Sequence, residues 1–298
     1  MTDPSAPTVS ADPGGDGGAP GSPRPARRHR FTPTQRHQIT QAAGWVVGVL
    51  LVGLVLAFAD WGRIADNFLD GPIAGEQFPD VLTIAAKNTV LYTVFSFTLG
   101  LVLGLLSALA RLSSVWLLRA YARAYVELFR GLPALLTIIL IGFAIPIALG
   151  IKVPRVEIAG VASLSGAGIL ALGLVAGAYL SETIRAGLQA VPEGQTEAAR
   201  SLGMSPTQTT IFVVIPQAFR IIIPPMANEM ILLLKDTALL SVLGTTVDSK
   251  ELTKFGRDGV SGNFNMTPLI VVGVIYVLIT IPLTQVVGRL ERRQQRAL

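Results

Sequence analysis

Three charged side chains interrupt a long apolar run near residue 230, and their types and spacing could do chemistry. Residues 221–247 are apolar except for Glu229, Lys235 and Asp236. An ionisable residue inside a membrane is costly, so it is a functional candidate by default. Glu229 and Asp236 are seven residues apart and share one helical face. They could line a polar path, or a Lys235–Asp236 network could hold helices together, and the sequence leaves both open. The candidate path consists of Glu229, Lys235, Asp236, Thr237 and Ser241.

A second segment, EAARSLGMSPTQTTIFVVIP at residues 197–216, is polar and helix-forming between two apolar runs. Gly203 follows Leu202 as a left-handed residue at a helix end should. Ser205 and Gln208 have the spacing of a capping box that starts a new helix. Pro216 lacks an amide donor and is expected to disrupt that helix or mark its end. We therefore predict two short helices with a sharp bend at Gly203. An ordinary hairpin between membrane spans is the alternative, although it would rarely need such definite start and stop signals.

The elements that position these residues are long apolar helices. The chain has 298 residues, of which 51% are hydrophobic and 14% are charged, whereas about 25% charged is usual for soluble domains. A membrane helix needs about 20 mainly apolar residues. The fold class is therefore all-α, a polytopic integral membrane protein with six transmembrane helices. The candidate spans are 41–59, 88–110, 131–151, 158–181, 221–247 and 259–288.

The N-terminal 60 residues divide into two parts. Residues 1–40 are rich in Pro, Gly, Ser and Ala, a composition that cannot bury enough apolar surface to fold. We predict a disordered cytoplasmic tail there, followed by an additional transmembrane helix at 41–60. The sequence Ala57-Phe58-Ala59 resembles a signal-peptidase site, but the region ahead of it is too long for a signal peptide.

The basic residues predict the orientation. With the N-terminus in the cytoplasm, sixteen Lys and Arg residues fall inside and seven fall outside, as the positive-inside rule expects. Both termini are then cytoplasmic, including the basic segment 291–298, and so is the polar segment between spans four and five. The net charge of +5 is explained by this distribution, so no nucleic-acid partner is expected.

Four motifs resemble the membrane subunits of bacterial ABC importers, in particular the polar-amino-acid permeases of the histidine, glutamine and glutamate type. Glu197-Ala198-Ala199, Gly203 and Val213-Val214-Ile215-Pro216 have the spacing of the family's cytoplasmic "EAA" loop. "VELFRGLPALLTIIL" at 126–140, "AYLSETIRAGLQAVPEGQTEAA" at 178–199 and "LLLKDTALLSVLG" at 232–244 occur in the family's order. The departures are Val213 for Ile, Ile215 for Leu, Ala186 for Gly, Ala238 for Ser and Leu243 for Ile. The resemblance implies a type I importer domain at 81–290, with the loop at 190–216. The family core has five helices, so the N-terminal helix is an addition.

The resemblance also implies partners and roles. A separate ABC ATPase subunit would carry ATP and Mg, and this chain would bind no cofactor. The other partners would be a second permease subunit, identical or paralogous, an extracytoplasmic amino-acid-binding protein, the lipid membrane and a polar amino acid, with glutamate- and glutamine-type systems the most similar. Arg130, Glu182 and Arg185 would be signature residues near the cytoplasmic gate. The residues implied in ATPase coupling are Glu197, Ala198, Ala199, Gly203, Ser205 and Pro216.

Residue types argue against the other function classes. The chain has no cysteine, its two histidines lie near the N-terminus, and no G-x-x-x-x-G-K-[ST] phosphate loop occurs. We therefore expect no metal site, no catalytic residues and no ATP hydrolysis by this chain. An intramembrane protease would need a serine–histidine pair or two membrane aspartates. The candidate spans contain no histidine and no aspartate besides Asp236, so this class is not expected. An ion-coupled secondary transporter remains the alternative, although it would not explain the polar segment.

Overall fold

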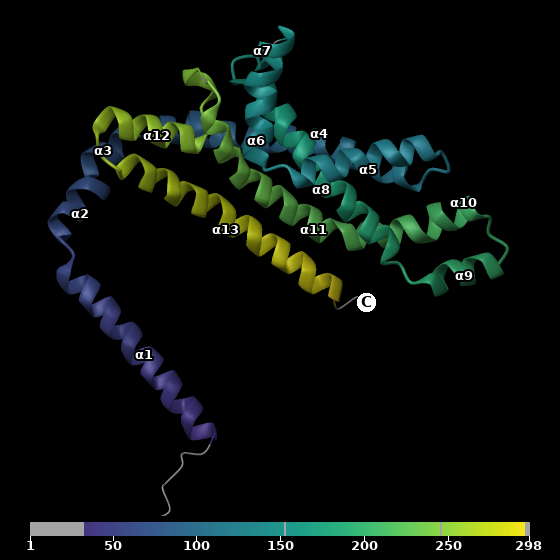
Figure 1. The fold of residues 1–298 in the computed structure, drawn as a ribbon, viewed down its shortest axis with the longest axis horizontal. Helices are drawn as coiled ribbons and strands as arrows, with labels where there is room; N and C mark the ends of the chain where they lie inside the picture. The colour runs from purple at the N-terminus through teal and green to yellow at the C-terminus, as the bar shows by residue number, and fades with distance from the viewer. Residues whose placement is uncertain (1–32, 152, 245, 296–298) are drawn as a thin grey trace, which may run out of the picture. The chain divides into compact units, whose positions relative to one another are not determined.

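The computed structural model describes residues 33–151, 153–244 and 246–295, and the chain forms two compact units, Met1–Ala59 and Asp60–Leu298 (Figure 1). In the first unit, helix α1 (Pro33–Phe58) contains an apolar stretch, Thr40–Phe58, long enough to span a membrane. The helix begins eight residues before the predicted boundary at 41, because Pro33 suits a first helical turn and Gln and Thr tolerate helix. The tail prediction for 1–32 lies outside the described residues.

Four further helical segments of the described chain are long and apolar enough to cross a membrane: Val81–Leu112, Gly166–Gln189, Pro206–Val242 and Thr267–Arg292. The predicted span at 131–151 differs, because α5 (Trp116–Gly131) and the next helix meet at a bend of 107°. A proline at residue 133 keeps Leu132 out of the helical region and so produces the break. The six predicted spans therefore correspond to five single helical segments and one bent pair of helices. After the bend come α6 (Ala134–Ile139), the π-turn η2 (Leu140–Ala144) and α7 (Ile145–Leu149).

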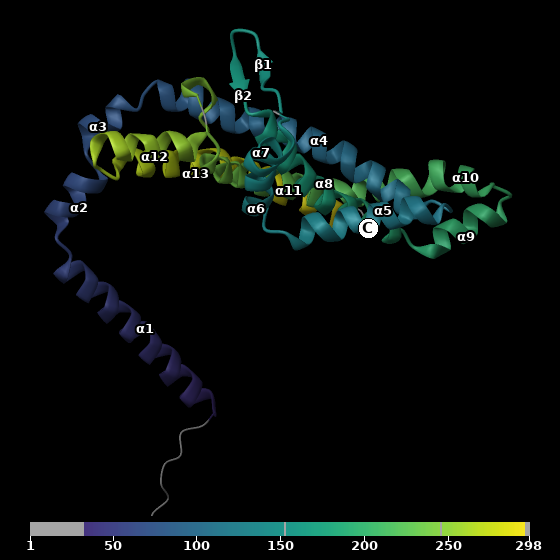
Figure 2. The ribbon, with the colours of Figure 1, turned by 45° about the horizontal axis from the view of Figure 1, so that its top comes forward.

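Two predicted spans had wrong boundaries. The span at 158–181 begins later, because a hairpin of β1 (Val156–Ile158) and β2 (Ala162–Leu164) precedes α8 (Gly166–Gln189), and Ser165 caps that helix. The span at 259–288 is two helices, α12 (Leu252–Asn263) and α13 (Thr267–Gln295). Figure 2 shows the hairpin projecting beside α7.

Short polar contacts fasten the start of the second unit to α13. Helices α2 (Trp61–Phe68) and α3 (Gly71–Glu76) are capped by Asp60 and Asp70. Asn265 donates to the carbonyl of Asp66 at 2.7 Å, and the Asp70 amide donates to the Thr267 hydroxyl at 3.0 Å. These bonds fix the first residues of α13, so this end of the helix has a defined position.

The tightest packing joins α8 to α4 (Lys87–Leu112), which continues the π-turn η1 (Val81–Ala86). Glycines make this approach possible, because a Cβ at Gly100 would lie 2.9 Å from the Cβ of Ala176. A Cβ at Gly177 would lie 2.5 Å from the hydroxyl of Tyr125, which donates to the carbonyl of Leu174 at 2.7 Å. Helices α4, α5 and α8 therefore form one closely packed group on which the sites depend.

Candidate functional site

Helix α9 (Glu193–Ser201) carries the EAA motif. Glu197 and Ala198 are exposed, whereas Ala199 turns inward and is 5% exposed. The side-chain amide of Gln217, in α11, donates to the side-chain oxygen of Gln195, in α9, at 3.5 Å. Most of the motif is thus presented on an open surface.

The predicted bend at Gly203 is present. Its φ of +87° is left-handed, and a Cβ there would meet no atom within 4 Å. The Gly203 amide donates to Arg200 at 3.0 Å and the Met204 amide donates to Ala199 at 3.2 Å. This pair of bonds is the Schellman arrangement that closes a helix. The end of α9 is therefore fixed by backbone bonds within five residues.

Helix α10 (Pro206–Thr209) starts with the predicted capping box. The Gln208 amide donates to the Ser205 hydroxyl at 3.3 Å, and the Ser205 amide donates to the Gln208 side-chain oxygen at 2.8 Å. Two donors that a helix start leaves open are thereby satisfied. In Figure 1, α9 and α10 lie side by side at one end of the second unit, beyond α8 and α11.

Of the two alternatives predicted for Pro216, the helix does not end there, but a π-turn interrupts the α-helical pattern directly before it. The π-turn η3 (Thr210–Val214) follows α10 and leads directly into α11 (Ile215–Asp236) and the 3-10 segment η4 (Thr237–Val242). Pro216 therefore lies inside a continuous helical path, and the wider π-turn directly before it gives room for the proline ring. One continuous helical path therefore runs from Pro206, just after the Gly203 bend, to Glu229 and Asp236 of the candidate path.

A cavity of about 570 Å³ lies where the α5–α6 bend faces α8 and α11. Glu229 and Asp236 both line it, as their shared helical face predicts. Arg130 lines the same cavity, with its guanidinium carbon 5.4 Å from the centre of the Tyr179 ring. The lining residues are Arg130, Gly131, Leu132, Pro133, Ala134, Val175, Tyr179, Glu229, Leu232 and Asp236.

The three signature residues meet around one carboxylate. Glu182 forms a close ion pair with Arg111 and accepts from Arg185 at 2.7 Å. Arg130 lies 3.9 Å from the same carboxylate. Glu182 thus links α4, α5 and α8 next to the cavity, and its charge is already balanced by two arginines before Arg130 is counted.

The other residues of the candidate path do not line the cavity. Lys235 is exposed, and within the described residues no ion pair joins it to Asp236, so the predicted Lys235–Asp236 network is not formed by a direct bridge. Thr237 is fully buried and donates to the Leu234 carbonyl at 2.7 Å. Ser241 accepts from Arg257 of α12 at 3.3 Å.

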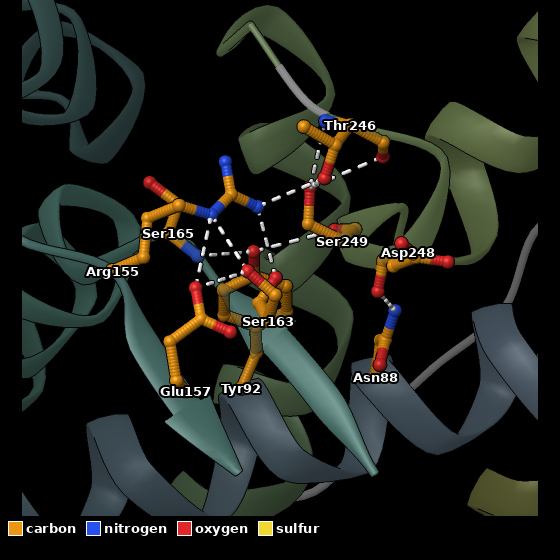
Figure 3. A network of polar contacts seen from close by, with 9 residues as sticks. All are labelled: Asn88, Tyr92, Arg155, Glu157, Ser163, Ser165, Thr246, Asp248 and Ser249. Carbon is orange, nitrogen blue, oxygen red and sulfur yellow. Dashed lines mark hydrogen bonds and ion pairs between the residues drawn. The ribbon is translucent and has the colours of Figure 1, made fainter. Parts of the chain in front are cut away.

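A polar network in Figure 3 joins α4, the β-hairpin and the loop that contains η5 (Val247–Ser249). Asn88 is fully buried and donates to the carbonyls of Asp248 and Lys250 at 2.8 and 3.0 Å. Tyr92 donates to the Ser249 carbonyl at 3.3 Å and accepts from the Ser165 amide at 2.8 Å. These bonds fasten the loop to α4, although the loop and α4 are far apart in the sequence.

Arg155 extends this network across the hairpin. Its guanidinium donates to the Ser163 side-chain and backbone oxygens at 2.8 and 2.9 Å. The same group donates to the Thr246 hydroxyl at 3.1 Å and lies 3.8 Å from the Glu157 carboxylate. One arginine therefore holds the hairpin against the loop before α12.

Glu251 caps α12 from a fully buried position. Burial raises the pKa of Glu251 to about 7, although hydrogen bonds from the Thr253 and Lys254 amides and the Tyr276 hydroxyl oppose the rise. At Asp258, burial also disfavours the charge, but the hydrogen bonds from Lys250 and Lys254 outweigh it and lower the pKa. Two carboxylates seven residues apart thus have opposite pKa shifts.

Sequence reasoning missed the roles of Asn88, Tyr92, Arg155 and Glu251. Asn88, Tyr92 and Arg155 have partners up to 162 residues away in the chain, which no local pattern announces. Glu251 bonds to the nearby Thr253 and Lys254, but its burial depends on how distant helices pack. The available sequence signal was a polar amide side chain at the first residue of the predicted membrane span 88–110, namely Asn88.

Comparisons with known proteins agree with this architecture. The chain is 32% identical over 217 residues to the glutamine transport system permease protein GlnP of Escherichia coli (strain K12), covering 72% of this chain and 93% of that protein. It is 31% identical over 250 residues to the arginine transport system permease protein ArgU of Corynebacterium glutamicum, covering 83% and 78%. The predicted resemblance to polar-amino-acid permeases is confirmed.

A solved structure and a family model extend this agreement. The crystal structure of an amino acid ABC transporter with histidines superposes with a TM-score of 0.67 at 33% identity, covering 75% of this chain and 98% of that one. Residues 100–296 match the model of the binding-protein-dependent transport system inner membrane component. The chain therefore belongs to the family of binding-protein-dependent transport system inner membrane components.

Proposed function

We propose that this chain is the membrane-spanning permease subunit of an ATP-driven importer that moves a polar amino acid across the cytoplasmic membrane. The observation that carries the proposal is the α9–Gly203–α10 segment. It is exposed, has defined helix ends and is continuous with α11, the helix that brings Glu229 and Asp236 to the cavity. We call residues 193–209 the coupling segment.

The coupling segment has the surface that an ATPase partner requires. Leu202 is 85% exposed at the bend, next to the exposed Glu197 and Ala198 of the EAA motif. A large apolar side chain within a polar, exposed segment is well suited to a protein interface. Family membership supports the assignment of that partner as the ABC ATPase subunit.

The same segment offers a route for motion. A displacement of α9 would act on α10 through the closed bend at Gly203, and α10 is continuous with α11. Because α11 lines the cavity with Glu229 and Asp236, movement of the segment would reshape the cavity. ATP binding and hydrolysis on the partner would thereby alternate access to the substrate, with no ATP site needed on this chain.

The remaining parts of the assembly follow from the family. A second permease subunit would complete the path, and an extracytoplasmic binding protein would deliver the amino acid. Both termini and the coupling segment would be cytoplasmic. The relatives are named for glutamine and for arginine transport, and the sequence motifs resemble glutamate- and glutamine-type systems. Because these names differ in the amino acid, the substrate has to be inferred from the residues that line the cavity.

Co-purification and uptake test this function. The complex isolated through this chain should contain an ATPase, and proteoliposomes with internal ATP should accumulate an amino acid. Glu197→Lys reverses a charge at the docking surface and should reduce the ATPase retained, whereas Glu291→Lys, an exposed residue of α13, should not. Uptake that depends on an ion gradient and not on ATP would support the secondary-transporter alternative.

Labelling tests the orientation separately. The chain has no native cysteine, so single cysteines can be placed at Thr196 and Phe264, both exposed. An impermeant thiol reagent added outside should label position 264 and leave position 196 unlabelled. The reverse pattern would contradict cytoplasmic termini.

A further inference from the structure

We propose that the cavity at the α5–α6 bend selects an amino acid whose side chain is positively charged, of the arginine or lysine type. The inference rests on the proposed function, because it assumes that the cavity lies on the substrate path. It is carried by the charges that line the cavity and by the partners these charges have or lack.

The cavity lining has an excess of negative charge. Glu229 and Asp236 carry two carboxylates, and Arg130 is the one cation among the described lining residues. A zwitterion with a neutral side chain leaves this excess unchanged, and a glutamate increases it. An arginine or lysine substrate removes it, and charge complementarity of this kind discriminates between partners, more strongly where the charges are half-buried, as Glu229 and Asp236 are.

The two carboxylates are available to a ligand. Within the described residues, neither Glu229 nor Asp236 has an ion-pair partner within 4.0 Å. Glu182 shows the contrast, since Arg111 and Arg185 both bind it directly. Lys235 lies near enough to interact electrostatically with Asp236, but it is exposed, does not line the cavity and forms no ion pair with either acid within 4.0 Å, so both carboxylates keep their contact positions free.

The lining also provides a place for each charged group of such a substrate. Arg130 lies against the Tyr179 ring, and its nearest carboxylate is the already paired Glu182 at 3.9 Å, so its donors can bind an α-carboxylate. Glu229 and Asp236 lie two helical turns apart, roughly 10 Å along the axis. The two carboxylates can therefore hold an α-ammonium and a distal side-chain cation at once.

Direct binding measures this selectivity without the delivery protein. The permease with its ATPase partner is placed in nanodiscs, and radiolabelled arginine, lysine, glutamine and glutamate are titrated onto it. Arginine or lysine should bind at least tenfold more tightly than glutamine, with glutamate the weakest. Glu229→Gln should reduce this preference by about tenfold while glutamine binding is retained. Glu127→Gln, an exposed residue of α5 outside the cavity, is the matched control and should leave both affinities unchanged.

The possible outcomes separate the charge selectivity from the proposed function. Tighter binding of glutamine or glutamate by the wild-type complex would overturn the charge selectivity and leave the proposed function intact. An unchanged preference in a Glu229→Gln complex that retains its ATPase would also overturn it. If no amino acid binds while the uptake test succeeds, the inference fails alone. If neither binding nor ATP-dependent uptake is observed, the proposed function fails and the inference fails with it.

Discussion

The coupling segment and the network around Tyr92 are both well defined, but they are built in opposite ways. In the coupling segment, the bonds that close α9 and open α10 join residues no more than five apart. In the network, Asn88 and Tyr92 bond to a loop that lies between 157 and 162 residues later in the chain. The first region is locally encoded, whereas the second exists only in the folded unit.

This difference suits two mechanical roles. A segment held by its own bonds can keep its shape while it moves relative to the rest of the chain. A loop fastened to α4 and to the hairpin by long-range bonds moves only with them. Changes to the network should therefore affect the stability of the whole unit, and changes to the coupling segment should affect partner binding first.

The largest expected effect concerns Glu251, at the start of α12 beside the network. Its pKa of about 7 in the folded protein is above the ordinary value of 4.5. Glu251 binds its proton more tightly in the folded state than in the unfolded state. The protonated side chain therefore stabilises the folded state fully below pH 4.5, and this stabilisation is lost as the pH rises through about 7. The difference is on the order of 3 kcal/mol.

Thermal unfolding of the complex in nanodiscs across this pH range measures that loss. Glu251→Gln should flatten the pH dependence, whereas Glu76→Gln, at an exposed side chain, should retain it. If the stability of the Glu251→Gln protein fell with pH as steeply as that of the wild type, another group would be responsible for the pH dependence.

Asn88→Ala should have the next largest effect. The substitution leaves the carbonyls of Asp248 and Lys250 without their buried donor, and we expect a loss of about 2 kcal/mol in unfolding free energy. Asn263→Ala removes a bond to the Gly259 carbonyl at an exposed position, and should cost less than about 0.5 kcal/mol. Equal losses in both variants would remove the distinction between long-range and local bonds.

Gly203→Ala should have a smaller and more local effect. A left-handed backbone costs an alanine about 1 kcal/mol, so hydrogen exchange should become faster in α9 and α10 and less ATPase should be retained. Gly194→Ala is the matched control, because Gly194 lies in α9 with open space around it and no positive φ. That change should slow the exchange. Faster exchange in both variants would contradict a role for the bend.

Sequence alone predicted what depends on neighbours in the chain. The left-handed Gly203, the Ser205–Gln208 capping box and the shared face of Glu229 and Asp236 are all present. Sequence alone left open whether Pro216 disrupts or ends its helix, because the π-turn that lets the helix continue leaves no clear sequence signal. The placement of Arg130 against Tyr179 and the burial of Glu251 depend on how distant helices pack, which residue spacing does not encode.

Photocrosslinking at Leu202 tests the coupling segment most directly. A photoreactive amino acid is placed at Leu202 or at Phe264, which are 85% and 91% exposed, in the purified complex with its ATPase. The two positions have similar exposure, but only Leu202 lies in the coupling segment. We predict an adduct of permease plus ATPase mass from position 202 and none from position 264. Absence of that adduct at 202 while the ATPase stays bound, or an equal yield at 264, would contradict docking through this segment.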